Sequence, residues 1–238
     1  MKKKVLFLGA SGLIGPHLTP GLEPYFDLRL ADVKSHPQQR SVLPVNITDY
    51  RQVLEAARGM DAIMNFTVVR GDPVQSFHVN VRGAWHVVKA AAALGIGKIV
   101  HSGPQSIRHV YDPHFDLGDV PRAPGSGYYG LTKALATEIC RAYARTCGLQ
   151  IISFVFCALG PSPTEAMHGR DFPPYTVVWE DLHQACRLAL EIESVPDGFQ
   201  EFDLLSFTGH GKYNVDKARR ILGFHPQEHW EAYYRRTP

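Results

Sequence analysis

Short apolar runs alternate along the chain with longer segments that have helical periodicity. This alternation is typical of parallel strands joined by crossover helices, and strands that are apolar throughout indicate a sheet covered on both faces. The sequence therefore predicts an α/β fold with a doubly wound parallel sheet. The predicted strands are Val5–Leu8, Leu28–Ala31, Ala62–Val69, Lys98–His101 and Ile151–Phe156, and two long helices are predicted at about 74–94 and 129–147.

Proline and glycine refine this outline. Pro20 falls inside the first predicted helix, where it removes an N–H donor and clashes with the preceding turn, so we expect a short or kinked helix. Both residue types concentrate at 103–130 and 160–174, which predicts two irregular loops. We expect residues 1–160 to form the core and residues 161–238 to form a small C-terminal substrate-binding annex that partly returns to the core.

Composition limits the classes of partner. The chain has 238 residues, 45% of them hydrophobic, with 25 Lys and Arg against 23 Asp and Glu. This balance gives no basic field for nucleic acid, and the histidines lack metal-ligand spacing, so no metal is expected. The apolar run after Lys4 stops at Gly9, too short for a signal peptide or a membrane span. Four scattered cysteines fit a reducing compartment, so a cytoplasmic location without a membrane partner is expected.

A glycine-rich turn follows the first predicted strand and opens a helix. Glycines at 9, 12 and 15 allow a tight turn and bring backbone N–H groups to a pyrophosphate at a helix N-terminus. Asp32 ends the second strand, where it can accept hydrogen bonds from the adenosine ribose. Its charge would repel a 2′-phosphate, which favours NAD over NADP, although Lys34 lies nearby. A Rossmann-type dinucleotide site is predicted, and a glycine turn without a ligand is the alternative.

Tyr129 and Lys133 lie four residues apart, on one face of a predicted helix near its start. A lysine ammonium beside a phenol, together with a positively charged nicotinamide, lowers the phenol pKa. A tyrosinate near neutrality can take the proton of a substrate hydroxyl while hydride leaves the same carbon. The pair therefore predicts an acid/base site for hydride transfer.

These motifs resemble the extended short-chain dehydrogenase/reductase superfamily, in its NAD-dependent epimerase/dehydratase branch. Further segments that resemble the family are Val45–Asp49, Asn80–Gly83, Val178–Leu182 and Asp216–Pro226. The resemblance implies that Tyr129 is the acid/base, that Lys133 orients the nicotinamide ribose, and that the cofactor is NAD. The implied cofactor-binding residues are Gly9, Ser11, Gly12, Leu13, Ile14, Gly15, Asp32, Asn46, Ile47, Phe66, Thr67, Val68, Asn80, Ser102, Tyr129 and Lys133.

The chain departs from the family pattern at three places. The position of the usual catalytic serine is occupied by Pro104, flanked by Ser102 and Ser106. We expect Ser106 to serve in its place; the alternative is that both serines only satisfy loop backbone groups. Many relatives have an arginine where this chain has Val155. The segment from Ser162 to Trp179 is short, which leaves little room for a nucleotide-sugar and resembles compact members such as uronate dehydrogenases.

Substrate contacts are expected from the loops around the nicotinamide end. The candidates are Arg70, Gln105, Ser106, His109 and Arg170, of which Arg170 suits a carboxylate. His101 is interpreted as a strand histidine with satisfied hydrogen bonds. By resemblance, the helix that carries Leu135, Ile139 and Tyr143 would form a homodimer interface, although the same stripe could simply cover the sheet.

The sequence thus favours an NAD-dependent oxidoreductase that oxidises a hydroxyl of a small polyhydroxylated substrate, either a free sugar or a sugar acid. An epimerase or dehydratase that recycles NAD internally is the second hypothesis. A non-catalytic NAD-binding protein is a third, favoured by Pro104 and Val155 and opposed by the Tyr129–Lys133 pair.

Overall fold

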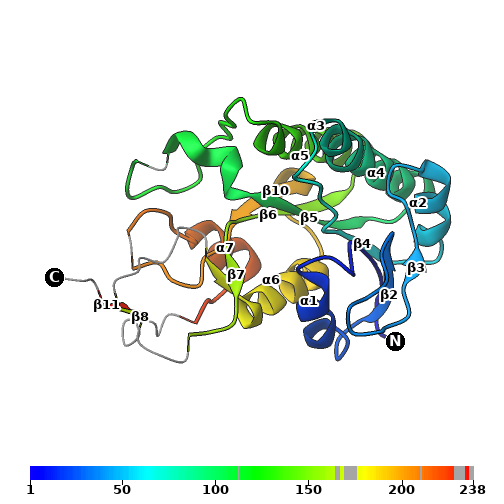
Figure 1. The fold of residues 1–238 in the computed structure, drawn as a ribbon, viewed down its shortest axis with the longest axis horizontal. Helices are drawn as coiled ribbons and strands as arrows, with labels where there is room; N and C mark the ends of the chain where they lie inside the picture. The colour runs from blue at the N-terminus through cyan, green and yellow to red at the C-terminus, as the bar shows by residue number, and fades with distance from the viewer. Residues whose placement is uncertain (112, 164–166, 169–175, 210, 228–233, 236–238) are drawn as a thin grey trace.

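Seven parallel strands form the central sheet of this protein (Figure 1). The computed structural model describes residues 1–238 except 112, 164–166, 169–175, 210, 228–233 and 236–238. The strand order is β10-β6-β5-β4-β1-β2-β3. The strands are β1 (Lys4–Leu8), β2 (Asp27–Asp32), β3 (Leu43–Pro44), β4 (Ala62–Asn65), β5 (Lys98–Pro104), β6 (Gln150–Phe156) and β10 (Phe199–Asp203). This order confirms the predicted doubly wound parallel sheet.

Helices cover both faces of the sheet (Figure 1). The first face carries α1 (Gly15–Leu22), α6 (Trp179–Glu191) and α7 (Asp216–Leu222), and the second carries α2 (Tyr50–Ala57), α4 (Gly83–Leu94) and α5 (Tyr128–Cys147). Strand β1 shows why both faces must be covered. Val5 and Phe7 are buried in the hydrophobic cluster beneath α1 and α6, whereas Leu6 and Leu8 are buried in the cluster beneath α2 and α4.

The connections include several short elements. The predicted helix at 74–94 is continuous but changes type: α3 (Pro73–Ser76) leads into a π-helix, η1 (Phe77–Arg82), and then into α4. Two short segments are 3-10 helices: η2 (Gln105–Tyr111) directly follows β5, and η3 (Pro196–Gly198) directly precedes β10. Two small parallel pairs join β7 (Leu159–Gly160) to β9 (Val177–Val178), and β8 (Met167–His168) to β11 (Tyr234–Arg235).

One predicted strand is too long. Strand β4 ends at Asn65, so the extension to Val69 is wrong. The Asn65 side-chain oxygen accepts hydrogen bonds from the backbone N–H and the hydroxyl of Thr67, and this local turn replaces further pairing. The first helix is short as predicted, with Pro20 inside its eight residues. Among the described residues, no helix is both long enough and apolar enough to cross a membrane.

Candidate active site

The glycine turn between β1 and α1 is packed so closely that two of its glycines have no room for a side chain. Gly9 has a φ of 86°, and a Cβ at this position would lie 2.8 Å from the Phe66 carbonyl carbon. A Cβ on Gly15 would lie 2.0 Å from the Ala10 carbonyl oxygen. The turn is therefore packed closely on itself and against the backbone that follows β4, and it leads directly into α1, whose first N–H groups have no partner within the helix.

Asp32 closes the turn from the end of β2. Its carboxylate accepts hydrogen bonds from the backbone N–H groups of Ser11, at 3.0 Å, and Lys34, at 3.1 Å. The Ser11 hydroxyl is buried and has no hydrogen-bond partner among the residues that the structure describes. A buried hydroxyl without a partner is costly unless a ligand satisfies it. The Asp32 carboxylate is held where it can accept hydrogen bonds from a ribose, which fits a dinucleotide.

A cleft of about 400 Å³ lies along this turn. The predicted cofactor residues that line it are Gly9, Gly12, Leu13, Ile14, Asp32, Asn46, Ile47, Phe66, Thr67 and Val68. The other predicted cofactor residues do not line it: Ser11, Gly15, Asn80, Ser102, Tyr129 and Lys133. The prediction missed Thr48, Gln75 and Val79, which do. Gln75 and Val79 lie on α3 and η1, and their approach to the cleft depends on the path of the chain after β4.

The Asn80 side chain makes its hydrogen bonds within the protein. Its side-chain oxygen accepts a hydrogen bond from the Val69 N–H, and its amide donates to the Val69 carbonyl and the Thr132 hydroxyl, each at 3.0 Å. The side chain is buried, and these hydrogen bonds satisfy its polar atoms. Asn80 therefore ties the loop after β4 to α5 and shapes the cleft from behind.

The acid/base candidates line a second cavity of about 340 Å³. Tyr129 and Lys133 come from the first turns of α5, Ser102 from β5, Ser106 from η2, and Arg70 from the loop after β4. Leu13, Ile14, Phe66, Val68 and Arg70 line this cavity and the dinucleotide cleft alike. The two cavities are therefore neighbours, as hydride transfer between a bound dinucleotide and a substrate requires.

Charges around Tyr129 differ from the expectation based on Lys133. Burial raises the pKa of Tyr129, and the positive charge of Arg70 acts in the opposite direction. Burial also lowers the pKa of Lys133 to about 8. The sequence predicted that Lys133 would lower the phenol pKa. In the structure, the cation that lowers it is Arg70.

Ser106 has a hydroxyl that is available to a ligand. Its Oγ is buried and has no hydrogen-bond partner within the described part of the chain. A Cβ on Gly130 would lie 3.2 Å from the Ser106 carbonyl oxygen and 3.3 Å from its Oγ. The glycine next to Tyr129 therefore lets η2 approach α5, so that serine and tyrosine share one cavity. Pro104 lines the same cavity without a hydroxyl to offer.

Other candidates are placed differently. His101 is buried, but neither ring nitrogen has a hydrogen-bond partner among the described residues, so the expectation of a satisfied histidine is wrong. Burial, with Lys133 nearby, holds its pKa well below the ordinary value and keeps the ring neutral. The side chains of Gln105 and His109 lie outside the described part of the structure, and so does all of Arg170. The sequence prediction missed two residues that follow β6 and line this cavity, Cys157 and Leu159.

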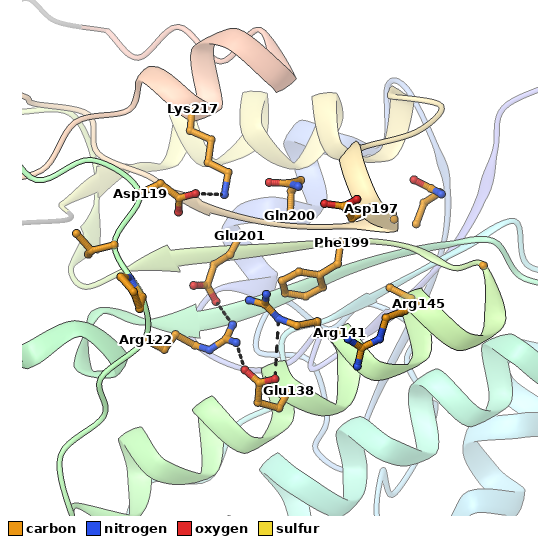
Figure 2. Close-up of a pocket in the computed structure, with 16 residues that line it drawn as sticks. Asp119, Arg122, Glu138, Arg141, Arg145, Asp197, Phe199, Gln200, Glu201 and Lys217 are labelled. Atoms are coloured by element: carbon orange, nitrogen blue, oxygen red, sulfur yellow. Dashed lines mark hydrogen bonds and ion pairs between the residues drawn. The ribbon is translucent and has the colours of Figure 1, made fainter.

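A third and larger cavity, of about 1000 Å³, is lined by residues of β10 and of the second half of α5 (Figure 2). Arg122 contacts Glu201 and Glu138 there, and Lys217 contacts Asp119 (Figure 2). Its lining carries as many acidic as basic side chains: Asp119, Glu138, Asp197 and Glu201 against Arg122, Arg141, Arg145 and Lys217. The described residues include no group of three His, Cys, Asp or Glu side chains that could hold a metal ion.

Comparisons with known proteins find relatives in sequence and in fold. A uronate dehydrogenase from Pseudomonas putida is 27% identical over 169 residues, which are 67% of this chain and 62% of that protein. The chain thus matches about three fifths of that relative's length. The crystal structure of a uronate dehydrogenase from Agrobacterium tumefaciens has a TM-score of 0.78 at 20% identity and covers 98% of this chain and 87% of its own.

A second solved structure, a UDP-glucose 4-epimerase from Brucella ovis in complex with NAD, has a TM-score of 0.73 at 16% identity, covering 94% of this chain and 93% of its own. The NAD-dependent epimerase/dehydratase family matches residues 5–205 of this chain, which include the glycine turn, the Tyr129–Lys133 pair and β10. The chain therefore belongs to the NAD-dependent epimerase/dehydratase family, with NAD as its cofactor.

Proposed function

We propose that this protein is an NAD-dependent oxidoreductase that oxidises a hydroxyl of a small polyhydroxylated substrate, a free sugar or a sugar acid. One observation carries the proposal: Tyr129, Lys133 and Ser106, whose hydroxyl has no partner among the described residues, line a cavity that adjoins the dinucleotide cleft. A phenol, an ammonium and a free hydroxyl around one small space are the groups that alcohol oxidation by hydride transfer needs.

Each side chain has a role that follows from its position. NAD supplies the hydride acceptor when it is bound. The Tyr129 phenolate takes the proton of the substrate hydroxyl as the carbonyl forms, and the Ser106 hydroxyl donates a hydrogen bond to the reacting oxygen. Arg70 is the cation that favours the ionised phenol, and Lys133, in the next turn of the same helix, lines the cavity where it would orient the nicotinamide ribose. The apolar side chains of Phe66, Phe156 and Leu159 line the cavity and exclude water.

The substrate class rests on size. The cavity at Tyr129 has about 340 Å³, and the segment from Ser162 to Trp179 is short. Both favour a free sugar or a sugar acid over a nucleotide-sugar. The likeness to uronate dehydrogenases in sequence and fold supports the same class. An epimerase would use the same proton and hydride transfers, but it would return the hydride to the substrate and release no NADH.

NADH appearance tests the proposal directly. Purified protein with NAD is mixed with a panel of sugars, sugar acids and other secondary alcohols, and absorbance of NADH is followed. We expect Tyr129→Phe to abolish turnover, because the proton acceptor is lost. Ser106→Ala should lower turnover by about 10²-fold, the usual effect of removing one donor to the reacting oxygen, with little change in NAD affinity. Ser41→Ala, at an exposed serine that lines neither cavity, is the matched control and should keep the wild-type activity.

Three results would count against this assignment. Equal turnover in Ser106→Ala would remove that residue from the reaction. Substrate conversion without net NADH would assign the protein to the epimerase or dehydratase class. Tight NAD binding with no conversion of any substrate would indicate a non-catalytic NAD-binding protein, the outcome that Pro104 makes worth testing.

A further inference from the structure

Arg70 reaches the acid/base tyrosine from the opposite wall of the cavity. Its guanidinium carbon lies 5.3 Å from the centre of the Tyr129 ring. The hydroxyl of the neighbouring Tyr128 donates a 2.7 Å hydrogen bond to the Arg70 carbonyl oxygen. Two consecutive residues at the start of α5 therefore hold Arg70, one by its backbone and one by its side chain. The guanidinium also takes part in a side-chain hydrogen bond with Tyr129, so it is held in place while its other N–H donors stay open.

The cavity has nothing of its own to neutralise this charge. Arg70 and Lys133 are basic, and none of the described residues that line the cavity is Asp or Glu. The remaining lining is largely apolar, including Leu13, Phe156 and Leu159. A cation in such surroundings interacts more strongly with an anion than it would in water. Because Arg70 is exposed, its guanidinium remains open to a ligand.

Position then limits where that anion can lie on the substrate. The reacting oxygen must lie within hydrogen-bond distance of the Tyr129 hydroxyl. A carboxylate that pairs with a guanidinium does so at about 2.7–2.9 Å, often through both oxygens. Since the guanidinium and the phenol are in contact with each other, a substrate that binds both from the same side of the cavity has its carboxylate close to the reacting hydroxyl.

We propose that Arg70 binds a carboxylate attached to the reacting carbon or to the carbon next to it, so that the substrate is a 2-hydroxy or 3-hydroxy acid. This inference rests on the proposed function and narrows it to sugar acids, or smaller hydroxy acids, that are oxidised beside the carboxylate. The O–H proton passes to the Tyr129 phenolate, the C–H bond breaks as hydride to NAD, and a carbonyl forms. The products are a 2-oxo or 3-oxo acid and NADH.

Charge-matched substrates and variants test the role of Arg70. The whole chain is assayed with 2-hydroxy and 3-hydroxy acids, with their uncharged amides, and with uronic acids oxidised at the carbon farthest from the carboxylate. We expect the wild type to prefer each acid to its amide by about tenfold or more in kcat/KM. Arg70→Met should lose this preference through a higher KM for the acid, and Arg70→Lys should restore part of it. Arg82→Met, an exposed arginine on η1 that lines neither cavity, should behave as wild type.

A second readout needs no substrate. Ionisation of Tyr129 is followed by the ultraviolet absorbance of tyrosinate, as the difference between each protein and its Tyr129→Phe counterpart. Since the Arg70 charge lowers the phenol pKa, Arg70→Met should shift this titration to higher pH. NAD affinity, measured by calorimetry, should stay within about threefold of wild type, because the glycine turn and Asp32 are untouched.

Several outcomes would overturn the inference. An acid preference that survives in Arg70→Met would show that another group binds the carboxylate. A loss of NAD affinity as large as the loss of kcat/KM would make Arg70 a cofactor contact. If uronic acids react as well as the 2-hydroxy and 3-hydroxy acids, the carboxylate does not need to lie beside the reacting carbon. In these cases the proposed function stands, whereas absence of NADH with every substrate, with NAD still bound, overturns both.

Discussion

Lys133 combines a functional position with an unfavourable environment. It is 2% exposed, and burial lowers its pKa from 10.5 to about 8. The stability linked to this group is therefore present above about pH 10.5 and is lost as the pH falls through 8. At pH 7 we expect Lys133→Met to raise the free energy of unfolding by roughly 3 kcal/mol, and to abolish turnover.

Urea unfolding of both proteins at pH 7 and near pH 10.5 checks this prediction. The advantage of Lys133→Met should be lost at the higher pH, and the exposed Lys2→Met should show no such dependence. Equal stabilities at pH 7 would mean that the Lys133 ammonium keeps its hydration inside the cavity. A gain in stability with loss of activity is the pattern expected of a residue retained for function.

Residues differ in how far the sequence could place them. Tyr129 and Lys133 were predictable, because a four-residue spacing fixes which side chains share a helix face. The contact of Arg70 with Tyr129 was not, since it depends on a loop path and on the conformation of a long side chain. Asn80 matches the family segment, yet its hydrogen bonds to Val69 and Thr132 become visible only when the loop and α5 are both in place.

At the scale of elements, the turn between β1 and α1 depends on the absence of one methyl group. A Cβ on Gly15 would lie 2.0 Å from the Ala10 carbonyl oxygen, a backbone atom that cannot move without moving the turn. We expect Gly15→Ala to destabilise the fold by about 1–3 kcal/mol and to weaken NAD binding by at least about tenfold. Calorimetric NAD titration and urea unfolding measure the two effects. Gly97→Ala, where a Cβ meets nothing within 4 Å, should change neither.

Strands were easier to predict than the segments that join them. A strand buried on both faces must be apolar at nearly every position, and β1 and β6 follow that rule closely enough to be read from the sequence. Phe66–Val69 is equally apolar, but it lines the cofactor cleft instead of extending β4. An apolar run indicates that a segment is buried, but it does not show whether the segment is buried in a sheet or against a ligand.

Across the whole molecule, a buried ion network joins the loop that carries Ser106 to the edge of the sheet. Arg108 in η2 is 1% exposed and contacts Glu201 at 2.8 Å and Asp203 at 3.2 Å, both on β10. Arg122 contacts Glu201 at 3.2 Å from the side of the larger cavity (Figure 2). Chain segments about 90 residues apart are thus held together by charges that water cannot reach.

The homodimer expected from the sequence remains a prediction.

Asp203 should give this network a signature in the pH dependence of stability. Burial raises its pKa from 3.8 to about 7, against the opposing effect of Arg108. Because the folded pKa lies above the unfolded one, the stability linked to Asp203 is complete below about pH 4 and is lost as the pH rises through 7. Relative to Asp203→Asn, the wild type should therefore lose several kcal/mol of unfolding free energy between pH 4 and pH 8. Groups common to both proteins cancel in this difference, and Asp27→Asn, at an exposed aspartate that begins β2, is the control. A difference that stays constant across this range would mean that Arg108 keeps the Asp203 carboxylate ionised throughout, and that the network is a fixed ion pair without a titrating member.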